Sequence, residues 1–357
     1  MKGGRSRSGG GSVSVDLTAL AEAVERFRGK TITVLGDFIA DEFQFGEISR
    51  VSREAPVLIL RHRATEVLPG GGANAANNLA DLGARVLPVT ATGDDAAGEA
   101  LIEYFRKKRV DTSGVVRVRG WTTPVKTRFL AGWPHTRRQQ VLRVDHEPKE
   151  PLPEAARKQI SRKLRERIDR ANALLVSDYG FGVASPELVR DTKQARKKRP
   201  MLTTLDSRYA LTSYAGCGVT AATPNEPELE ALHHAQIAQD MQALERCGQT
   251  TLESMKLRSL LVTRGKDGMA LFEHGRPMVT IPICGSDQAV DVTGAGDTVI
   301  AAYTLALASG ASALEAAHIA NFAGGVVVMK RGTATVSASE LLQVIRSEAT
   351  GGTKSQP

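Results

Sequence analysis

The stretch Ala289-Val-Asp-Val-Thr-Gly-Ala-Gly-Asp-Thr298 places a turn of small residues directly before an apolar helical run that begins at Val299. Glycine and alanine let the backbone approach a ligand closely, and the first N–H groups of a helix have no partner within the helix. Together with the helix dipole, the N–H groups of Gly294, Ala295 and Gly296 therefore predict an anion site.

Asp297 lies beside this predicted anion site, in the first turn of the helix. A carboxylate there repels a bound phosphate, so its position requires an explanation. One interpretation is that it caps the helix N-terminus. The other is a general base that takes the proton from a hydroxyl attacking a phosphoryl group. Phosphoryl transfer needs this combination, with a base at the nucleophile and donors around the transferred oxygens.

Short apolar runs alternate with helical patterns along the rest of the chain, which indicates parallel strand pairing and an α/β sandwich. Helix starts are indicated by Ser185-Pro186 and by capping boxes at Ser312 and Ser337. The predicted strands are 31–35, 85–90, 173–177, 202–205, 218–222 and 260–263, and the predicted helices include 73–82, 98–108 and 154–170.

Two segments, 42–69 and 120–145, interrupt this order because apolar and polar residues alternate in them. This period predicts half-exposed antiparallel strands outside the parallel sheet, as a small β lid. The exposed edges of such strands also predict a homodimer. We expect one domain over 15–349, with flexible Gly- and Ser-containing tails at 1–14 and 350–357.

A glycine turn at 68–74 presents Asn74, whose amide offers a donor and an acceptor to sugar hydroxyls. The spacing Gly70-x-Gly72-x-x-Ala75 also fits a dinucleotide-binding fingerprint. That fingerprint follows the first core strand of its fold, whereas here a predicted lid segment precedes it. A tight turn into a helix is the third interpretation of this segment.

Asn225 and Glu228 are three residues apart in Thr223-Pro-Asn-Glu-Pro-Glu228. If Asn225 opens a helix, both side chains can face a metal–phosphate cluster, and Mg²⁺ prefers oxygen ligands with retained waters. The alternative is structural, since Asn is a common N-cap residue and acidic first turns are routine.

The net charge of +8, from 47 Lys and Arg against 39 Asp and Glu, raises the question of a nucleic-acid partner. Much of this excess lies between 151 and 200, on predicted helix faces with few aromatic residues to stack on bases. We therefore expect no nucleic-acid partner. Three dispersed cysteines indicate a reducing compartment, and no stretch is apolar enough to span a bilayer, so we expect a cytoplasmic protein without a membrane partner.

Taken together, these segments resemble the ribokinase-like sugar kinases, the phosphofructokinase-B family, over about residues 31–345. The resemblance implies a three-layer α/β/α sandwich with a mostly parallel central sheet and a small β-strand lid. It also implies a carbohydrate kinase that uses ATP and Mg²⁺. It is carried by Asp291-Val-Thr-Gly-Ala-Gly-Asp-Thr298, Gly70-Gly-Gly-Ala-Asn74, Asn225-x-x-Glu228 and Val262-Thr-Arg-Gly265.

Other segments resemble the D-glycero-β-D-manno-heptose-7-phosphate kinases within that family. They are Gly36-Asp-x-x-x-Asp41, 48–57, 139–145, Ser177-Asp-Tyr-Gly180 and 324–333. This resemblance implies phosphorylation of the anomeric hydroxyl to the 1,7-bisphosphate, a step of ADP-heptose biosynthesis. The chain departs from that pattern at Gly72, at Phe181, where Lys is usual, and at Asp206-Ser-Arg208, where Asp-Pro-Lys is usual. Arg208 can replace that Lys as a cation near a phosphate, although the two are not equivalent.

The residues and the resemblance together assign the candidate site. Asp297 is the base, and the N–H groups of Gly294, Ala295 and Gly296 stabilise the transferred phosphoryl group. The nucleotide is assigned to Asn225, Glu228, Thr263, Gly265, Gly268 and Asn321, with Asn225 and Glu228 reaching Mg²⁺ directly or through water. The sugar phosphate is assigned to Asp37, Asp41, Gly70, Gly71, Asn74, Lys126, Arg128, Arg143 and Arg208, with Arg137 or Arg138 as further candidates. Each basic lid residue is equally consistent with a solvated strand position.

Two other function classes stay open. The first is another sugar or sugar-phosphate kinase of the same family, of the ribokinase or fructokinase type. The second is a non-catalytic regulator that binds a sugar or a nucleotide, although the intact segment 294–297 argues against it. Some members of the heptose subfamily carry a fused nucleotidylyltransferase, but the histidines of this sequence form no H-x-G-H, so we expect no such module here.

Overall fold

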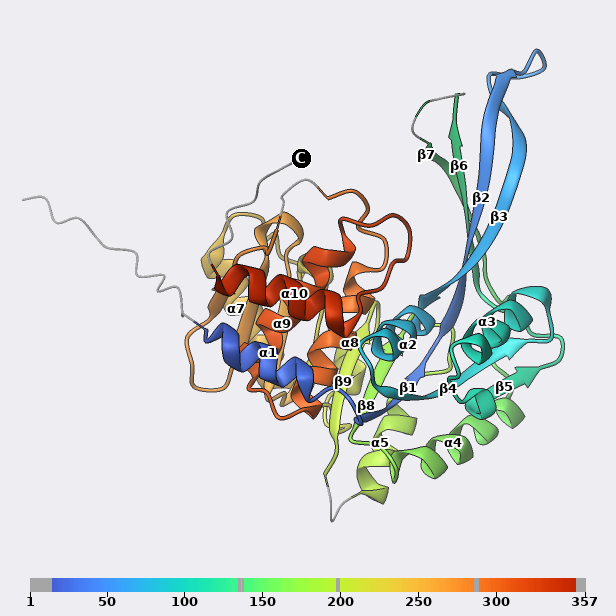
Figure 1. Ribbon diagram of the computed structural model, residues 1–357. Helices are drawn as coiled ribbons and strands as arrows, with labels where there is room; N and C mark the ends of the chain where they lie inside the picture. The colour runs from blue at the N-terminus through green and yellow to red at the C-terminus, as the bar shows by residue number, and fades with distance from the viewer. Residues whose placement is uncertain (1–14, 134–135, 137, 197–199, 286–288, 351–357) are drawn as a thin grey trace, which may run out of the picture.

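The computed structural model describes residues 15–133, 136, 138–196, 200–285 and 289–350. These residues form one nine-stranded sheet and a separate four-stranded sheet (Figure 1). The predicted tails lie outside the described residues, except for Thr350.

The large sheet is parallel from β11 to β5, and only its β12 and β13 edge is antiparallel. Its order is β13-β12-β11-β10-β9-β8-β1-β4-β5. The central strand β8 is buried throughout, because helices cover both faces of a parallel sheet. The strands are β1 (Thr31–Gly36), β4 (Arg85–Gly93), β5 (Val115–Val118), β8 (Ala173–Asp178), β9 (Leu202–Ser207), β10 (Ala221–Ala222), β11 (Ser259–Thr263), β12 (Met269–Glu273) and β13 (Val279–Ile281).

Helices cover the large sheet in two layers, each with its own apolar core, which confirms the predicted α/β/α sandwich. The first layer contains α1 (Leu17–Glu25), α2 (Gly72–Asp81), α3 (Ala96–Lys107), α8 (Ala295–Ala308), α9 (Ala313–Val327) and α10 (Ala338–Ala349). The second contains α4 (Glu154–Ile168), α5 (Pro186–Ala195), α6 (Glu226–His233) and α7 (Met241–Met255). Short 3₁₀ helices occur at Thr112–Gly114, Leu211–Tyr214 and Gly265–Asp267.

Most of the predicted elements form within a few residues of their expected bounds. The capping boxes at Ser312 and Ser337 are present, and the Ser185 side chain caps α5. The strand predicted over 218–222 is wrong in length, since only Ala221 and Ala222 pair. Gly218 has a φ of +99°, which is incompatible with a regular strand at that position.

The small sheet extends away from the sandwich (Figure 1) and has the order β3-β2-β6-β7. We call it the lid; it consists of β2 (Phe38–Val51), β3 (Leu58–Gly71), β6 (Val125–Gly132) and β7 (Gln139–His146). β2–β3 and β6–β7 pair antiparallel as predicted, but β2 and β6 pair in parallel, so the expectation of antiparallel strands throughout was wrong. Both strands leave the same large sheet in one direction, because β2 follows β1 and β6 follows β5, which run parallel in that sheet.

Candidate active site

The candidate site lies where the carboxyl ends of the parallel strands meet, the usual ligand edge of an open α/β sheet. Asp37 follows β1, Tyr179 follows β8, Asp206 lies near the end of β9, and Thr263 ends β11. The N-terminus of α8 faces the same edge, since Gly294 and residues of these strand ends line one cavity. The fold thus brings together segments that are far apart in the sequence.

Asp297 occupies the first turn of α8 and is almost completely buried. Its Oδ2 accepts a hydrogen bond from Asn74 Nδ2 (3.0 Å), and its Oδ1 accepts one from Tyr179 Oη (2.9 Å). Burial raises the pKa of Asp297 to about 7, although both hydrogen bonds lower it. The partners come from α2 and from the end of β8, and among the described residues no side-chain hydrogen bond caps α8, so the carboxylate is held by its surroundings and does not act as a helix cap.

The turn before α8 carries the three predicted N–H donors, and they differ in how they are bonded. Ala295 donates its N–H to the carbonyl oxygen of Val292 at 3.2 Å, so this group is engaged within the turn. Within the described part of the chain, the N–H groups of Gly294 and Gly296 have no hydrogen-bond partner. The anion site predicted from the sequence therefore rests on Gly294 and Gly296 rather than on all three residues.

The glycine turn at the end of β3 holds Asn74 against the base. Gly71 has a φ of +56° and precedes α2, and a Cβ on Gly70 would lie 2.6 Å from the Asp41 carboxylate. The Asn74 amide donates to Asp297 and to the carbonyl oxygen of Gly294 (3.2 Å). This differs from the expectation that Asn74 faces a sugar. The turn follows a lid strand rather than a core strand, which also argues against the dinucleotide interpretation.

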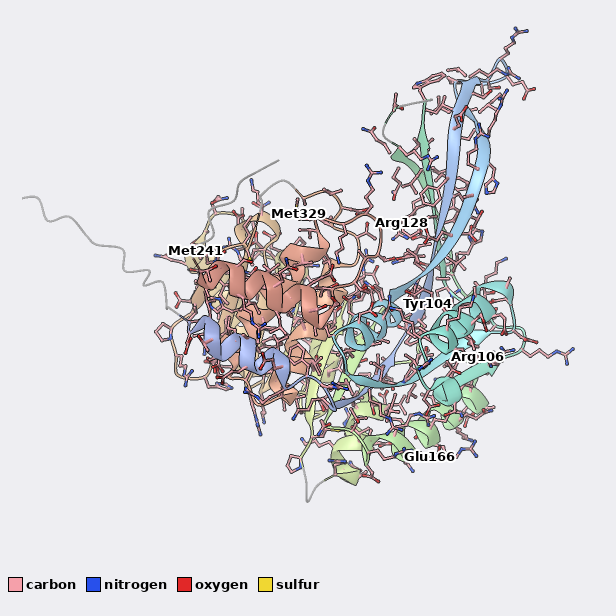
Figure 2. All side chains as sticks on the ribbon, viewed as in Figure 1. Tyr104, Arg106, Arg128, Glu166, Met241 and Met329 are labelled. Carbon is pink, nitrogen blue, oxygen red and sulfur yellow. The ribbon has the colours of Figure 1, made fainter. Side chains whose placement is uncertain are left out.

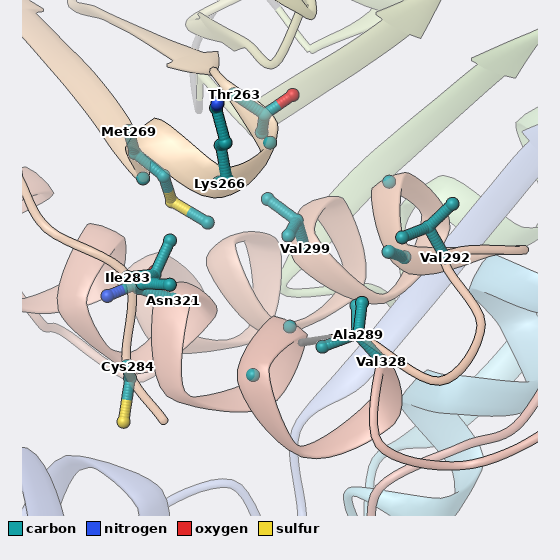
Figure 3. A pocket seen from close by; sticks show the side chains of 16 residues that line it. Thr263, Lys266, Met269, Ile283, Cys284, Ala289, Val292, Val299, Asn321 and Val328 are labelled. Carbon is teal, nitrogen blue, oxygen red and sulfur yellow. The ribbon is translucent and has the colours of Figure 1, made fainter. Parts of the chain in front are cut away.

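A cavity of about 310 Å³ lies between the β11–β12 turn and helices α8 and α9 (Figure 3). Its side chains are mostly apolar, as suits the ring of a nucleotide base. Gly268 has a φ of +80°, and a Cβ there would lie 2.1 Å from the Ile281 carbonyl oxygen. Asn321 donates its amide to the Pro282 carbonyl oxygen at 2.7 Å. The predicted nucleotide residues that line this cavity are Thr263, Gly265, Gly268 and Asn321.

A second cavity, of about 360 Å³, adjoins the first, because Thr263, Val292 and Gly296 line both. It is acidic: Asp206 and Glu228 line it, and burial raises the pKa of both carboxyls, with further repulsion at Asp206 from Asp297 and Glu228. The complete lining is Asp178, Tyr179, Asp206, Arg208, Thr223, Asn225, Glu228, Thr263, Val292, Gly294 and Gly296.

Asn225 and Glu228 cap a helix and also line the acidic cavity, so both interpretations of their spacing apply. Asn225 is the N-cap of α6; its Oδ1 accepts from the Glu228 N–H (2.8 Å), and Glu228 Oε2 accepts from the Asn225 N–H (2.9 Å). The capping alternative is therefore confirmed, and both residues also line the acidic cavity.

The acidic cavity offers the oxygen donors that Mg²⁺ prefers. Asp206 and Glu228 supply carboxylates, and the buried Thr223 Oγ1 has no hydrogen-bond partner among the described residues. No group of three or more His, Cys, Asp or Glu side chains in the described ranges is arranged to hold a metal by itself. This donor set suits an ion that shares its ligands with phosphates and waters.

Asp37 accepts hydrogen bonds from the loop after β8 and does not face an open sugar site. It is 1% exposed. Its Oδ2 accepts the N–H groups of Tyr179 (2.8 Å) and Phe181 (3.1 Å), and its Oδ1 accepts that of Val183 (3.0 Å). Burial raises the pKa of Asp37 to about 6. This placement differs from the expectation that Asp37 holds the substrate.

The lid cations differ in how far they are neutralised. Arg128 forms a buried ion pair with Asp41 at 2.5 Å and lies at the base of the lid (Figure 2). Arg143 pairs with Asp145 on the exposed strand β7. Arg138 lies over the Phe45 ring, and Arg137 lies outside the described residues.

Lys126 and Arg208 form no ion pair with any carboxylate of the described residues. Lys126 Nζ lies 5.2 Å from the centre of the Tyr179 ring, and Arg208 lines the acidic cavity. Burial and the charge of Arg208 lower the pKa of Lys126, whereas the charges of Asp41 and Asp145 raise it. They are the predicted cations most available to an anionic substrate.

Two residues of the site were not among those predicted. Tyr179 donates a hydrogen bond to Asp297, and Asp206 lines the acidic cavity together with Glu228. Both stand at the end of a buried strand, in Ser177-Asp-Tyr-Gly180 and Asp206-Ser-Arg208. Their position at the carboxyl end of a predicted strand was the sequence signal that could have identified them as site residues. Outside the two cavities, Arg264 pairs with Glu226, the first residue of α6, at 2.6 Å.

Comparison with known proteins shows the family of this chain. Residues 31–340 match the pfkB family of carbohydrate kinases. The bifunctional protein HldE of Geobacter sulfurreducens is 38% identical over 310 residues, which cover 87% of this chain and 61% of that protein. HldE of Mesorhizobium japonicum is 39% identical over 330 residues, which cover 90% of this chain and 63% of that protein. The chain thus spans less than two thirds of these relatives.

Solved structures share the fold at low sequence identity. Phosphofructokinase-2 from Escherichia coli in complex with fructose-6-phosphate superposes with a TM-score of 0.68 at 21% identity, covering 90% of this chain and 99% of that one. Arabidopsis thaliana ribokinase complexed with ribose and ATP superposes with a TM-score of 0.65 at 21% identity, covering 89% of this chain and 99% of that one.

The helices of the described residues are all too short or too polar to cross a membrane.

Proposed function

Because this chain belongs to the pfkB family of carbohydrate kinases, we propose that it transfers the γ-phosphoryl group of ATP to the anomeric hydroxyl of D-glycero-β-D-manno-heptose 7-phosphate. The product is the 1,7-bisphosphate, and the reaction belongs to ADP-heptose biosynthesis in the cytoplasm. The HldE relatives support the heptose. The observation that carries the proposed chemistry is the buried Asp297, which Asn74 and Tyr179 bond and which directly follows Gly296, a residue that lines both cavities.

Asp297 is the general base in this proposal. The substrate hydroxyl attacks the γ-phosphorus, its proton passes to Asp297, and the bond from phosphorus to the bridging oxygen of ADP breaks. The free N–H groups of Gly294 and Gly296 face the developing negative charge. ATP occupies the cavity lined by Thr263, Gly268 and Asn321.

Magnesium belongs to the acidic cavity in this proposal. A bound Mg²⁺ neutralises the ATP phosphates and orients the γ-phosphoryl group. Glu228 and Asp206 are the carboxylates that would hold it, directly or through water, with Asn225 beside them. Burial raises the pKa of both carboxyls, and the charge of Glu228 raises that of Asp206 further, so a bound cation would stabilise their ionised forms.

Lys126 and Arg208 are the proposed partners of the substrate 7-phosphate. Both cations lack an ion pair among the described residues, whereas Arg128 and Arg143 are paired with Asp41 and Asp145. Two cations without an ion pair, one over the Tyr179 ring and one in the lining of the acidic cavity, suit a sugar that already carries a phosphate. We also propose that the enzyme is a homodimer joined through the lid, whose strand β7 is exposed along its length.

A coupled assay of ADP formation tests the function. Purified protein is supplied with ATP, Mg²⁺ and one of four acceptors: the heptose 7-phosphate, fructose 6-phosphate, ribose or fructose. We expect turnover with the heptose 7-phosphate and loss of it without Mg²⁺. Activity on ribose or fructose, with the heptose 7-phosphate inert, would instead establish the ribokinase or fructokinase alternative, and activity on fructose 6-phosphate would establish another sugar-phosphate kinase of the same family.

The Asp297→Asn variant tests the base in the same assay. Removal of a general base commonly costs roughly 10²–10⁴-fold in rate, so we expect kcat to fall in that range. ATP binding, measured by calorimetry, should remain because Asp297 lies outside the nucleotide cavity lining. A variant that keeps most of its turnover refutes the base. A wild-type protein that binds ATP and sugar without turnover supports the regulator alternative.

A further inference from the structure

Tyr179 is the one phenol that bonds the proposed base among the described residues. Its hydroxyl donates to Asp297 Oδ1 at 2.9 Å, while Asn74 holds the other carboxylate oxygen. Burial and the negative charge of Asp297 raise the pKa of Tyr179 well above its usual value, so the hydroxyl keeps its proton and acts as a donor. Each oxygen of the carboxylate therefore has a fixed donor.

The position of Tyr179 is set by its own backbone. Its N–H donates to Asp37 Oδ2 at 2.8 Å, and Gly180 N–H donates to Asp178 Oδ1 at 3.0 Å. Asp37 also holds Phe181 and thereby fixes the loop on both sides of Gly180, whose φ is +86°. This buried carboxylate follows β1 directly, so the large sheet anchors the phenol.

The face of the Tyr179 ring is covered from the lid. Lys126 of β6 lies with Nζ 5.2 Å from the ring centre, within the range of a cation–π contact. The phenol therefore lies between a lid residue and the base. Other charged groups that act on the base are Asp41 of β2, which raises its pKa, Lys126, which lowers it, and Asp206 of β9.

We propose that Tyr179 is a positioning residue that holds the Asp297 carboxylate in its reactive orientation and connects it to the lid through Lys126. This inference rests on the proposed role of Asp297 as the base. Near-attack geometry is required for proton transfer, and a carboxylate free to rotate about its last bond loses that geometry. The phenol thus acts through the base and touches no reacting atom itself.

The test is Tyr179→Phe, with Tyr303→Phe as the matched control. Tyr303 is a buried tyrosine of α8 whose hydroxyl contacts Ser259, so the control removes the same atom away from the base. A hydrogen bond to a charged group corresponds to roughly a 10- to 100-fold change in rate. We expect Tyr179→Phe to lose kcat in that range with little change in KM for ATP, and Tyr303→Phe to keep wild-type kcat.

The pH profile separates positioning from general loss of structure. The Tyr179 hydrogen bond lowers the pKa of Asp297, so its removal should move the acidic limb of the kcat profile to higher pH. The plateau above that limb should stay reduced, because the carboxylate is also misplaced. Wild-type kcat with an unmoved limb overturns the proposal, and so does a rise in KM for the sugar with kcat and limb unchanged.

A second variant keeps the test decisive if Tyr179→Phe folds poorly. Site-specific 3-fluorotyrosine at position 179 retains the shape and makes the phenol a stronger donor, so the acidic limb should move to lower pH; an unmoved limb overturns the proposal. Asp297→Asn is measured alongside. An active Asp297→Asn shows that the base itself is wrongly assigned, whereas an inactive one with a wild-type-like Tyr179→Phe refutes only the positioning role.

Discussion

Asp297 shows how a functional residue alters the stability of its own fold. Its pKa is about 7 in the folded protein and near 3.8 when unfolded, so the folded state binds more protons between these values. The free energy of unfolding must therefore contain a contribution that is complete below pH 4 and is lost as the pH rises through 7. At higher pH the folded state must bury an ionised carboxylate, which lowers the free energy of unfolding.

Asp297→Asn should remove this cost. We expect its Tm to exceed that of the wild type by roughly 2–4 °C at pH 8, and the difference to shrink toward pH 4. Thermal unfolding across a pH series measures it. Asp169→Asn, at a carboxylate that is 80% exposed, is the control and should show no such trend. A difference that is constant with pH, or that grows as the pH falls, contradicts the raised pKa.

At the residue scale, the sequence indicated which residues lie near one another more reliably than it indicated their hydrogen-bond partners. The turn at Gly294 and the placement of Asp297 follow from local chemistry, because a helix N-terminus is a local feature. The partners of Asn74 and Asp37 do not, since they come from 220 and about 145 positions away. A side-chain amide suits a sugar or a carboxylate equally, and only the fold decides which one it meets.

At the scale of elements, the start of α8 separates a structural glycine from a functional one. Gly294 has a φ of +77°, and a Cβ there would lie 2.4 Å from Asn74 Nδ2. A Cβ on Gly296 would meet no described atom within 4 Å, yet Gly296 lines both cavities. A methyl group at Gly296 therefore clashes with no described part of the protein but occupies cavity space in which we propose that the ATP phosphates bind.

Gly296→Ala should keep or slightly raise stability, because alanine is favoured over glycine in a helix by about 0.5–1 kcal/mol. We expect the same variant to raise KM for ATP about tenfold or more, whereas Gly294→Ala should lower Tm. Thermal unfolding and steady-state kinetics on both variants check the pair. If Gly296→Ala has a wild-type KM for ATP, the phosphates do not lie against this turn.

In the lid, the sequence predicted the presence of the strands but not their direction. Alternation at 42–69 and 120–145 predicted strands outside the sandwich, and β2, β3, β6 and β7 are there. Alternation reports only which faces are exposed, so it carries no information on strand direction. The parallel pairing of β2 and β6 follows instead from the strand order of the large sheet, which is a non-local property.

At the scale of the whole molecule, the lid leaves apolar surface exposed at the sheet edge. On β7, Leu142 is 55% exposed, and Val141 and Val144 are also exposed. An exposed strand edge with apolar side chains is unfavourable in a monomer and pairs readily with a second copy. Figure 1 shows the lid extending away from the sandwich, and we propose that a second lid pairs with it there.

Leu142→Glu should therefore convert a dimer into a monomer. A buried glutamate in the proposed interface loses its hydration without gaining a partner, which typically outweighs the contacts of one apolar side chain. Met241→Glu is the control, because Met241 is 38% exposed on the sandwich, far from the lid (Figure 2). Light scattering after size exclusion should show a dimer for the wild type and for Met241→Glu, and a monomer for Leu142→Glu. A wild type that is monomeric at all concentrations, or a Leu142→Glu variant that stays dimeric, means that the edge of β7 is not the interface.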